Sequence, residues 1–445
     1  MSIRILYWNI ENFAFNKIAN PNTRKRQKGA SRKLAQAAED RKDYILQHLT
    51  SLNPFPDIMV VVEVETAYDG DGRIVRGAGA NGAVTLLDEI RDATGNDDWM
   101  LVPPLQTGPN EAVGVYYNST NLVFTGPCVW PGGAGATAQI GGPTGAYPPP
   151  FNNTITTGRD VPDGALYNVD VPEDECAARV RYTYNNNNPG LQGQQVILFS
   201  RMPYMVTFAE LDANDDVIAN LTLYAIHSPA NAFSAGMYLD DLADYEEITD
   251  ALANDEIRVI VGDFNVNLMS AAPNFTESAH YNPLQNAGYA LALKPLGAAP
   301  NPANGYPGYY ATHIRRGSKA VYWSTTDLTT YYPGYGMIGS DLVQNFYAID
   351  NIFTCYGAGW QPPANNRFTI MNGIVGSPYN LHAVPAVGTP QGTLAFGIDM
   401  ASAAFAAPPA TGPAFSVGRR TAFNGWDNYG HIRSTSDHLA LVIDV

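Results

Sequence analysis

The sequence Ile257-Arg258-Val259-Ile260-Val261-Gly262-Asp263-Phe264-Asn265 is the stretch around which the chain is organised. Its first five residues form an apolar run that predicts a buried strand, and Gly262 would allow a sharp turn after it. If the extended geometry continues, Asp263 and Asn265 point to the same side. A carboxylate at such a strand end can take a proton or hold a water, and an amide can donate to an anionic oxygen. For residues 261–265 alone, an ordinary Asp/Asn turn is the alternative.

The composition limits the classes of function. The chain has 445 residues, enough for one large core or two modest domains, and its formal net charge is -16. This negative charge argues against a protein that binds nucleic acid through an overall positive charge. Metal ions can still neutralise the charge of a site locally. One basic segment, from Lys17 to Lys42, reverses the balance. It is either a solvated loop and helix face or an edge that faces phosphate.

The cysteines and the apolar runs bear on the compartment. Cys128, Cys176 and Cys355 are too few for a disulfide framework and lack metal-site spacing, although the first two could pair. Ile3 to Trp8 already predicts a strand, so we expect no secretory signal. No apolar run is long enough to span a bilayer. We expect a soluble protein, cytoplasmic by default, with non-classical export as the alternative.

Apolar runs alternate with amphipathic segments along the chain, which favours a single α/β domain over residues 1–445. Two long stretches rich in Gly, Pro and Asn, at about 126–193 and 357–424, are predicted to be insertions, because structureless loops of this length are rare in compact domains. Strands are predicted at residues 4–13, 57–65, 111–117, 179–182, 196–199, 205–211, 221–226, 257–261, 320–324, 347–354 and 439–445, and helices at about 31–52, 81–94 and 233–253.

Polar residues recur at the predicted strand ends in a fixed order. Each of them alone has an ordinary structural explanation, such as a turn or a strand end. Glu63 and Glu65 follow an apolar run that suggests burial on both faces, and such carboxylates are costly to bury unless they bind a metal or a partner. The set comprises Asn9, Glu11, Glu63, His227, Asp263, Asn265, Asp350, Asp437 and His438.

The motifs that carry this set resemble those of the endonuclease/exonuclease/phosphatase, or DNase I-like, superfamily. They span the chain apart from its insertions. The pair of glutamates in the second motif is similar to a branch of bacterial nucleases. The motifs are WNIEN at 8–12, DIMVVVEVET at 57–66, IHSP at 226–229, GDFN at 262–265, AIDNIF at 348–353 and SDH at 436–438.

The resemblance implies a four-layer α/β/β/α sandwich with its site at one edge of the sheets. It also implies divalent-metal hydrolysis of a phosphoester, with Mg²⁺ as the usual ion and Mn²⁺ or Ca²⁺ as alternatives. Hard oxygen ligands suit these ions. By position in the family, Glu63 would be the main metal ligand, with Asn9 beside it and Glu11 or Asp437 as further ligands.

The resemblance also implies roles for the other residues. Asp263 would orient or deprotonate the attacking water, and Asn265 would bind phosphoryl oxygens. His438, steadied by Asp350, and His227 would contact the phosphate and stabilise its developing charge. A second pair, His227 with Glu111, is expected from the position of Glu111 before its strand. Arg201 is either a phosphate contact or part of a surface ion pair. His313 and His431 are expected to be structural or surface residues.

Three functions remain open at this point, because one fold serves many chemistries. The first is a nuclease that cleaves DNA or RNA, which makes nucleic acid the expected partner. The second is a phosphatase or phospholipase acting on an inositol phosphate or a sphingomyelin. The third is a non-catalytic binding or structural protein. The IHSP motif lacks the basic residue that often follows this histidine in bacterial nucleases, and the acidic charge further weakens the inference to DNA. The oligomeric state stays open.

Overall fold

The computed structural model describes residues 2–19, 29–66, 74–126, 128–129, 139–140, 149–155, 162–165, 201, 203–268, 277–293, 312–314, 335–338, 341–344, 346–360, 363, 368–371 and 435–445. Three predicted strands, at 179–182, 196–199 and 320–324, lie outside these residues, as do His431 and Cys176. None of the described helices is long and apolar enough to cross a membrane.

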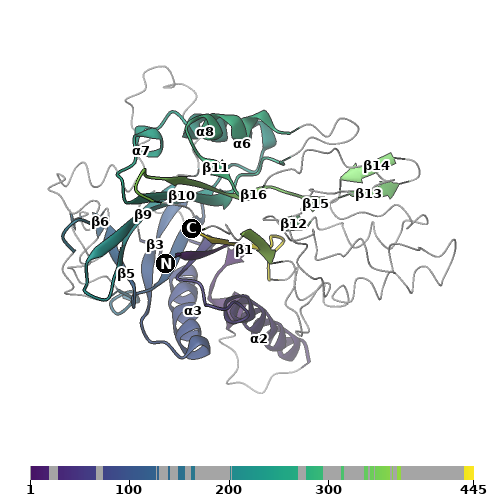
Figure 1. Ribbon diagram of the computed structural model, residues 1–445. Helices are drawn as coiled ribbons and strands as arrows, with labels where there is room; N and C mark the ends of the chain where they lie inside the picture. The colour runs from purple at the N-terminus through teal and green to yellow at the C-terminus, as the bar shows by residue number, and fades with distance from the viewer. Residues whose placement is uncertain are drawn as a thin grey trace.

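The first sheet contains both ends of the chain. Its strands run in the order β17-β18-β1-β2-β4-β3. β1 and β2 are parallel neighbours, and the remaining pairs are antiparallel. The termini lie side by side (Figure 1), because β1 pairs with β18. The strands are β1 (Arg4–Phe13), β2 (Ile58–Glu65), β3 (Trp99–Gly108), β4 (Glu111–Asn118), β17 (Phe368–Met371) and β18 (Ala440–Asp444).

The second sheet repeats this plan in the order β11-β16-β10-β9-β8-β5. Its parallel pair is β9 with β10, and antiparallel strands flank it on both sides. The strands are β5 (Leu122–Gly126), β8 (Tyr204–Leu211), β9 (Val217–His227), β10 (Glu256–Asp263), β11 (Ala290–Leu291) and β16 (Asp350–Tyr356). Each sheet therefore has a parallel pair joined by a helical crossover.

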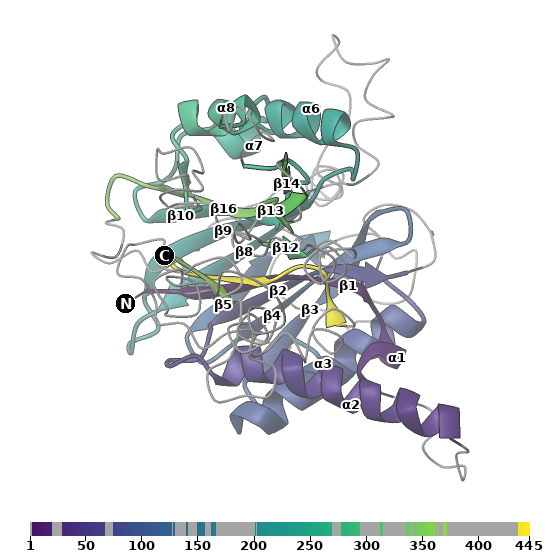
Figure 2. The same cartoon turned by 90° about the vertical axis from the view of Figure 1, so that its right-hand side faces the viewer.

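Helices cover the outer face of each sheet, which gives four layers (Figures 1 and 2). β1 contacts β10, and β2 contacts β9, so the parallel pairs face each other. One continuous apolar core fills the space between the sheets and beneath the helices. The helices of the first sheet are α1 (Phe15–Ile18), α2 (Gly29–Thr50) and α3 (Ala78–Thr94), and those of the second are α6 (Ala232–Leu242), α7 (Glu246–Thr249) and α8 (Asn282–Asn286), preceded by the short helix η1 (Ala279–Tyr281).

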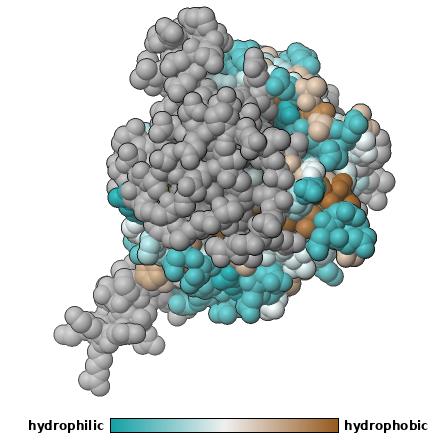
Figure 3. Space-filling model, turned by 90° about the vertical axis from the view of Figure 1, so that its left-hand side faces the viewer, coloured by the Kyte–Doolittle hydropathy of each residue, from teal (hydrophilic) through white to brown (hydrophobic). Residues whose placement is uncertain are grey.

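Three small sheets lie outside the sandwich. They pair β6 (Cys128–Val129) with β7 (Gln139–Ile140), β12 (His313–Ile314) with β15 (Phe346–Tyr347), and β13 (Tyr335–Ile338) with β14 (Asp341–Gln344). The described surface in Figure 3 is mainly hydrophilic with small hydrophobic areas. Phe55 and Phe233 are the exposed large hydrophobic residues among those described. The two stacked sheets with helices on both outer faces confirm the four-layer α/β/β/α sandwich that the sequence motifs led us to expect.

Two predicted elements are each divided in the structure. The helix predicted at 233–253 is broken between α6 and α7. Asp240, Asp241 and Asp244 place negative charge at the C-terminal end of α6, where the helix dipole disfavours it and the last turn contains no basic residue. The strand predicted at 347–354 is interrupted at Ala348 and Ile349, because side chains of Asn267 and Thr312 accept hydrogen bonds from their backbone N–H groups.

Two further expectations need correction. Gly262 makes no turn: it lies within β10, and a Cβ atom there would come 2.6 Å from Cβ of Ile226. Its small size allows close contact with β9. The region from about 357 to 424 is not wholly an insertion either, because β17 lies within it and pairs with β18 in the first sheet. β17 has only four residues, three of them buried, and is too short for its apolar pattern to predict a strand among the surrounding Gly and Pro residues. The single-domain boundary and the remaining insertion limits stay predictions.

Candidate active site

The site lies where polar strand ends of both sheets meet. Asp263 ends β10, opposite His227 on β9 and Asp350 on β16. From the first sheet come Asn9 on β1, Glu63 on β2 and His438, which lies two residues before the start of β18. Because each strand is buried up to its polar end, packing of the two sheets brings these side chains together.

Asp263 is the centre of this group. Its Oδ2 atom lies 3.3 Å from Nδ2 of Asn9, 3.5 Å from Nε2 of His227 and 3.6 Å from Nε2 of His438. Burial raises the pKa of Asp263, and the negative charge of Asp350 adds to this, against the lowering effect of the two imidazoles. A buried carboxylate with a raised pKa that faces two imidazoles has the properties of a general base.

Glu63 and Asn9 form an oxygen-rich corner beside Asp263. Oε1 of Glu63 accepts from Nδ2 of Asn9 at 3.0 Å, and its Oε2 accepts from the backbone N–H of Asn12. Burial opposes ionisation, yet His227 and His438 hold the pKa of Glu63 below its usual value. Oδ1 of Asn9 is buried without a hydrogen-bond partner. An ionised carboxylate beside an unsatisfied amide oxygen fits Mg²⁺ or Mn²⁺, which prefer oxygen ligands.

The backbone around this corner adopts an uncommon conformation. Glu63 and Asn12 have φ angles of 61° and 51°, and Asn265 has 50°. Left-handed residues other than glycine are rare and cluster at functional sites. The bulges in β1 and β2 that contain Asn12 and Glu63 break the simple alternation of side chains.

His438 is held by the opposite sheet. Its Nδ1 atom donates to Oδ2 of Asp350 at 2.8 Å, and the hydroxyl of Tyr7 donates to Oδ1 of the same carboxylate. Burial disfavours the charged ring, but Asp350 and Asp263 raise the pKa of His438 well above 6.5. The expected pairing of Asp350 with His438 is therefore present, and it turns Nε2 of the ring towards Asp263.

Glu111 and Arg201 hold His227 in place beside Asp263 and Glu63. Nδ1 of the ring lies 2.8 Å from Oε2 of Glu111, which is the pair expected from the sequence. Arg201 donates to Nε2 of His227 at 2.7 Å and also forms an ion pair with Glu111. Burial lowers the pKa of His227, but Glu111, Asp263 and Glu63 outweigh this effect and raise the pKa above its usual value. Arg201 is thus a neighbour of this histidine in the structure, not part of an isolated surface pair.

The remaining predicted residues lie at the edge of the group. Asn265 donates from Nδ2 to the carbonyl of Ser228 and from its backbone to Oδ1 of Asp263. Asp437 lies beside His438, with 3.8 Å between Oδ1 and Nε2. Glu11 is not among the described residues that gather within ligand distance of one another. The bulge between Asn9 and Phe13 disturbs the period of two that had suggested a shared face.

Two neighbours of the site were missed or misjudged from the sequence. His313, expected to be structural or on the surface, lies 3.4 Å from Oδ2 of Asp437. Lys17 donates to the carbonyl of Glu11, and burial lowers its pKa to about 8, partly offset by Glu11, Glu63 and Asp437. In the sequence, Lys17 is the first residue of the basic segment. Lys42, its last residue, instead forms ion pairs with Glu39 and Glu89.

Comparison with known proteins gives no sequence match: no protein-family model and no curated protein matches the chain. Among solved structures, humanized D. rerio TDP2 is similar with a TM-score of 0.40 and 9% identity, covering 100% of this chain and 98% of that one. An endonuclease/exonuclease/phosphatase family protein from Leptotrichia buccalis gives 0.39 and 9%, covering 99% and 98%. A Bacteroides thetaiotaomicron mannosyl-6-phosphatase gives 0.32 and 10%, covering 83% and 87%.

The fold rests on the chain's own architecture. Two mixed sheets with facing parallel pairs, helices on both outer faces and polar strand ends gathered at one edge are the features that the sequence motifs led us to expect. The chain has the endonuclease/exonuclease/phosphatase, or DNase I-like, fold.

Proposed function

We propose that the protein is a divalent-metal-dependent phosphoester hydrolase, and more specifically a phosphodiesterase that cleaves nucleic acid. The observation that carries the proposal is the convergence of His227 and His438 on Oδ2 of Asp263, next to the carboxylate of Glu63. A buried base flanked by two imidazoles and a metal-ligand carboxylate suits attack of water on an anionic phosphate, which repels hydroxide unless its charge is neutralised.

Each side chain then has a role that follows from its contacts. Asp263 holds the attacking water and accepts its proton. His438, fixed by Asp350, and His227, fixed by Glu111, face the phosphoryl oxygens and stabilise the charge that develops on them. Asn265 donates to the same oxygens after leaving its contact with Ser228. Arg201 adds positive charge beside His227, and Lys17 adds positive charge near Glu63 and Asp437.

Glu63 and Asn9 are the residues that would hold the divalent cation, and Asp437 would be a further ligand. When bound, Mg²⁺ or Mn²⁺ supplies Lewis-acid stabilisation of the phosphoryl charge. The fit rests on the unsatisfied Oδ1 of Asn9 and on the depressed pKa of Glu63.

One exposed aromatic residue favours a nucleic-acid substrate over a small phosphate ester. Phe233 is 75% exposed and lies in the first turn of α6, which begins shortly after the end of β9 at His227. An exposed aromatic ring offers a surface on which a base can stack, and such stacking is worth about 1–3 kcal/mol per base. The net charge of -16 indicates that binding relies on such local contacts and on the cation.

The test compares substrates with one set of proteins. Wild type, Asp263→Asn and His438→Gln are incubated with supercoiled plasmid, RNA, bis(p-nitrophenyl) phosphate, p-nitrophenyl phosphate and sphingomyelin, with Mg²⁺ or with a chelator. We expect cleavage of the diesters by wild type, loss with the chelator, and a decrease of about 100-fold or more in each variant. Asp98→Asn, on an exposed turn, is the matched control and should retain activity.

The same experiment separates the alternatives. Preferential hydrolysis of p-nitrophenyl phosphate or sphingomyelin would replace the nuclease by a phosphatase or phospholipase. Absence of hydrolysis with every substrate and every divalent ion would remove the enzyme proposal. Phe233→Ala should raise KM for the nucleic acids about tenfold and leave KM for bis(p-nitrophenyl) phosphate unchanged.

A further inference from the structure

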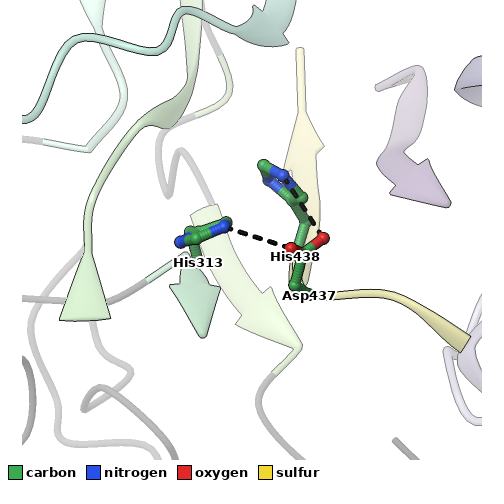
Figure 4. A group of neighbouring side chains, drawn as sticks. All are labelled: His313, Asp437 and His438. Atoms are coloured by element: carbon green, nitrogen blue, oxygen red, sulfur yellow. Dashed lines mark ion pairs between the residues drawn. The ribbon is translucent and has the colours of Figure 1, made fainter. Parts of the chain in front are cut away.

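A second group of possible metal ligands lies beside the one that contains Glu63. It consists of His313, Asp437 and His438 (Figure 4), whose ligand atoms all lie within 4.8 Å of one another. Nε2 of His313 is 3.4 Å from Oδ2 of Asp437, and Nε2 of His438 is 3.8 Å from Oδ1. The two imidazole rings are 4.7 Å apart in an edge-to-face arrangement. We call this set the imidazole cluster.

The backbone holds the two histidines in place independently of each other's side chains. His313 and His438 form an antiparallel bridge, and Leu439 donates to the carbonyl of Thr312 at 2.7 Å. The hydroxyl of Thr312 accepts hydrogen bonds from the backbone N–H groups of Ile349 and Asp350, both at 3.0 Å. The residue before His313 is therefore hydrogen-bonded to the start of β16, the strand that carries Asp350, the partner of His438.

His438 also has the outer contact that is typical of a metal-ligating histidine. Its Nδ1 donates to the carboxylate of Asp350, and its Nε2 lies between Asp263 at 3.6 Å and Asp437 at 3.8 Å. A carboxylate on the far side of the ring fixes the tautomer and makes the ligating nitrogen more basic.

We propose that the imidazole cluster binds a borderline transition-metal cation such as Zn²⁺ or Co²⁺ next to the oxygen-rich site at Glu63 and Asn9, and that this cation takes Asp437 as its own ligand in place of that site. Ligands about 2.0–2.1 Å from a tetrahedral zinc ion lie roughly 3.4 Å apart, which matches the distance between His313 and Asp437. Two imidazoles and one carboxylate select such ions over Mg²⁺ and Ca²⁺, and three protein ligands leave one position for water.

The cluster has a consequence for regulation that rests on the proposed function. His438 belongs both to the imidazole cluster and to the group that faces the phosphate. A cation on Nε2 of His438 removes that nitrogen from the phosphate, so Zn²⁺ should inhibit the Mg²⁺-dependent hydrolysis. His313 contacts Asp437, and the group of possible ligands that contains His313 does not include Asp263.

Co²⁺ absorption provides a test that does not depend on activity. Chelator-treated wild type is titrated with Co²⁺ in mildly alkaline buffer in the presence of excess Mg²⁺. We expect one equivalent to bind with the visible absorption of low-coordinate cobalt and to be displaced by Zn²⁺. His313→Gln should weaken Co²⁺ binding about 100-fold, since loss of even an outer contact costs 10–100-fold. Glu63→Gln should bind Co²⁺ like wild type.

Controls separate this proposal from the proposed function. His280→Gln removes another histidine that pairs with a carboxylate, Asp240 at 2.9 Å, and should leave Co²⁺ binding unchanged. If phosphoesterase activity is found, His313→Gln should retain it in Mg²⁺ and lose its inhibition by Zn²⁺. Stoichiometric Co²⁺ binding without any hydrolysis would support the cluster and contradict the enzyme. Equal Co²⁺ affinity in wild type and His313→Gln would overturn the cluster.

Discussion

Asp350 on the second sheet accepts a hydrogen bond of 2.8 Å from Nδ1 of His438, which lies two residues before β18 of the first sheet. Asp350 is fully buried, and Tyr7 from β1 donates to its other oxygen at 3.2 Å. This contact makes the orientation of a site histidine depend on the packing of the two sheets. The same carboxylate raises the pKa of the ring, with burial opposing it.

The first prediction concerns this pair. Asp350→Asn keeps the size of the side chain but removes its negative charge, so His438 loses the partner that fixes its ring. We expect kcat for the best diester substrate to fall about 100-fold with KM changed little, because the group acts on the developing charge. Steady-state kinetics at saturating Mg²⁺ provides the measurement. Asp215→Asn, on an exposed turn, is the control, and an unchanged kcat in Asp350→Asn would contradict the role of the pair.

The second prediction separates Glu63 from Glu65. Glu63 is mostly buried and contacts Asn9, whereas Glu65, the last residue of β2, is exposed. Glu63→Gln should weaken the apparent affinity for Mg²⁺ at least roughly tenfold, and Glu65→Gln should leave it unchanged. Both variants should unfold at the wild-type temperature, because glutamine adopts the left-handed backbone as readily as glutamate does. Calorimetric Mg²⁺ titrations and thermal denaturation check both statements. Equal Mg²⁺ affinities in the two variants would move the ligand role away from Glu63.

Much of the site could be predicted from the sequence because its residues sit at the ends of strongly apolar strands. Asp263 and His227 both lie at strand ends, as the sequence predicted, and the structure brings them together because their strands are parallel neighbours. Irregular backbone explains the errors. The bulge between Asn9 and Phe13 interrupts the period of two from which a shared face of Asn9 and Glu11 was predicted, and no local pattern distinguishes a bulged strand from a regular one.

Contacts between distant segments account for what the sequence missed. His313 reaches Asp437 through a bridge between a two-residue strand and the segment before β18. Its surroundings carry no apolar periodicity, so neither its strand nor its partner could be anticipated. Gly262 was misread for a similar reason, because the contact that requires glycine comes from the neighbouring strand and not from a turn.

The third prediction concerns the dependence of stability on pH. His48 is fully buried, stacks on Trp8 with 4.4 Å between ring centres, and donates from Nδ1 to the carbonyl of Tyr44. Burial lowers its pKa from 6.5 to about 4. Between these values the unfolded chain binds more protons at this residue, so the free energy of unfolding falls as the pH falls from 6.5 to about 4. A shift of this size corresponds to about 3 kcal/mol.

Urea denaturation across this pH range measures the effect. His48→Gln has no titrating ring, so its free energy of unfolding should fall by about 3 kcal/mol less than that of wild type over the same range. His280→Gln, in which the lost ring is partly exposed, should follow the wild-type curve. Parallel curves for wild type and His48→Gln would show that His48 is not held neutral by burial.

The last prediction concerns the glycine beside Asp263. A Cβ atom at Gly262 would lie 2.6 Å from Cβ and 2.7 Å from the carbonyl oxygen of Ile226, so Gly262→Ala must push β9 and β10 apart. We expect a loss of about 1–3 kcal/mol in the free energy of unfolding, typical of overpacking. Activity should fall more than stability suggests, because the displaced strands carry His227 and Asp263. Gly114→Ala, whose Cβ would meet its nearest atom at 3.4 Å, is the matched strand control. Urea denaturation and kcat/KM of the folded protein measure the two effects, and wild-type values of both in Gly262→Ala would refute the requirement for glycine.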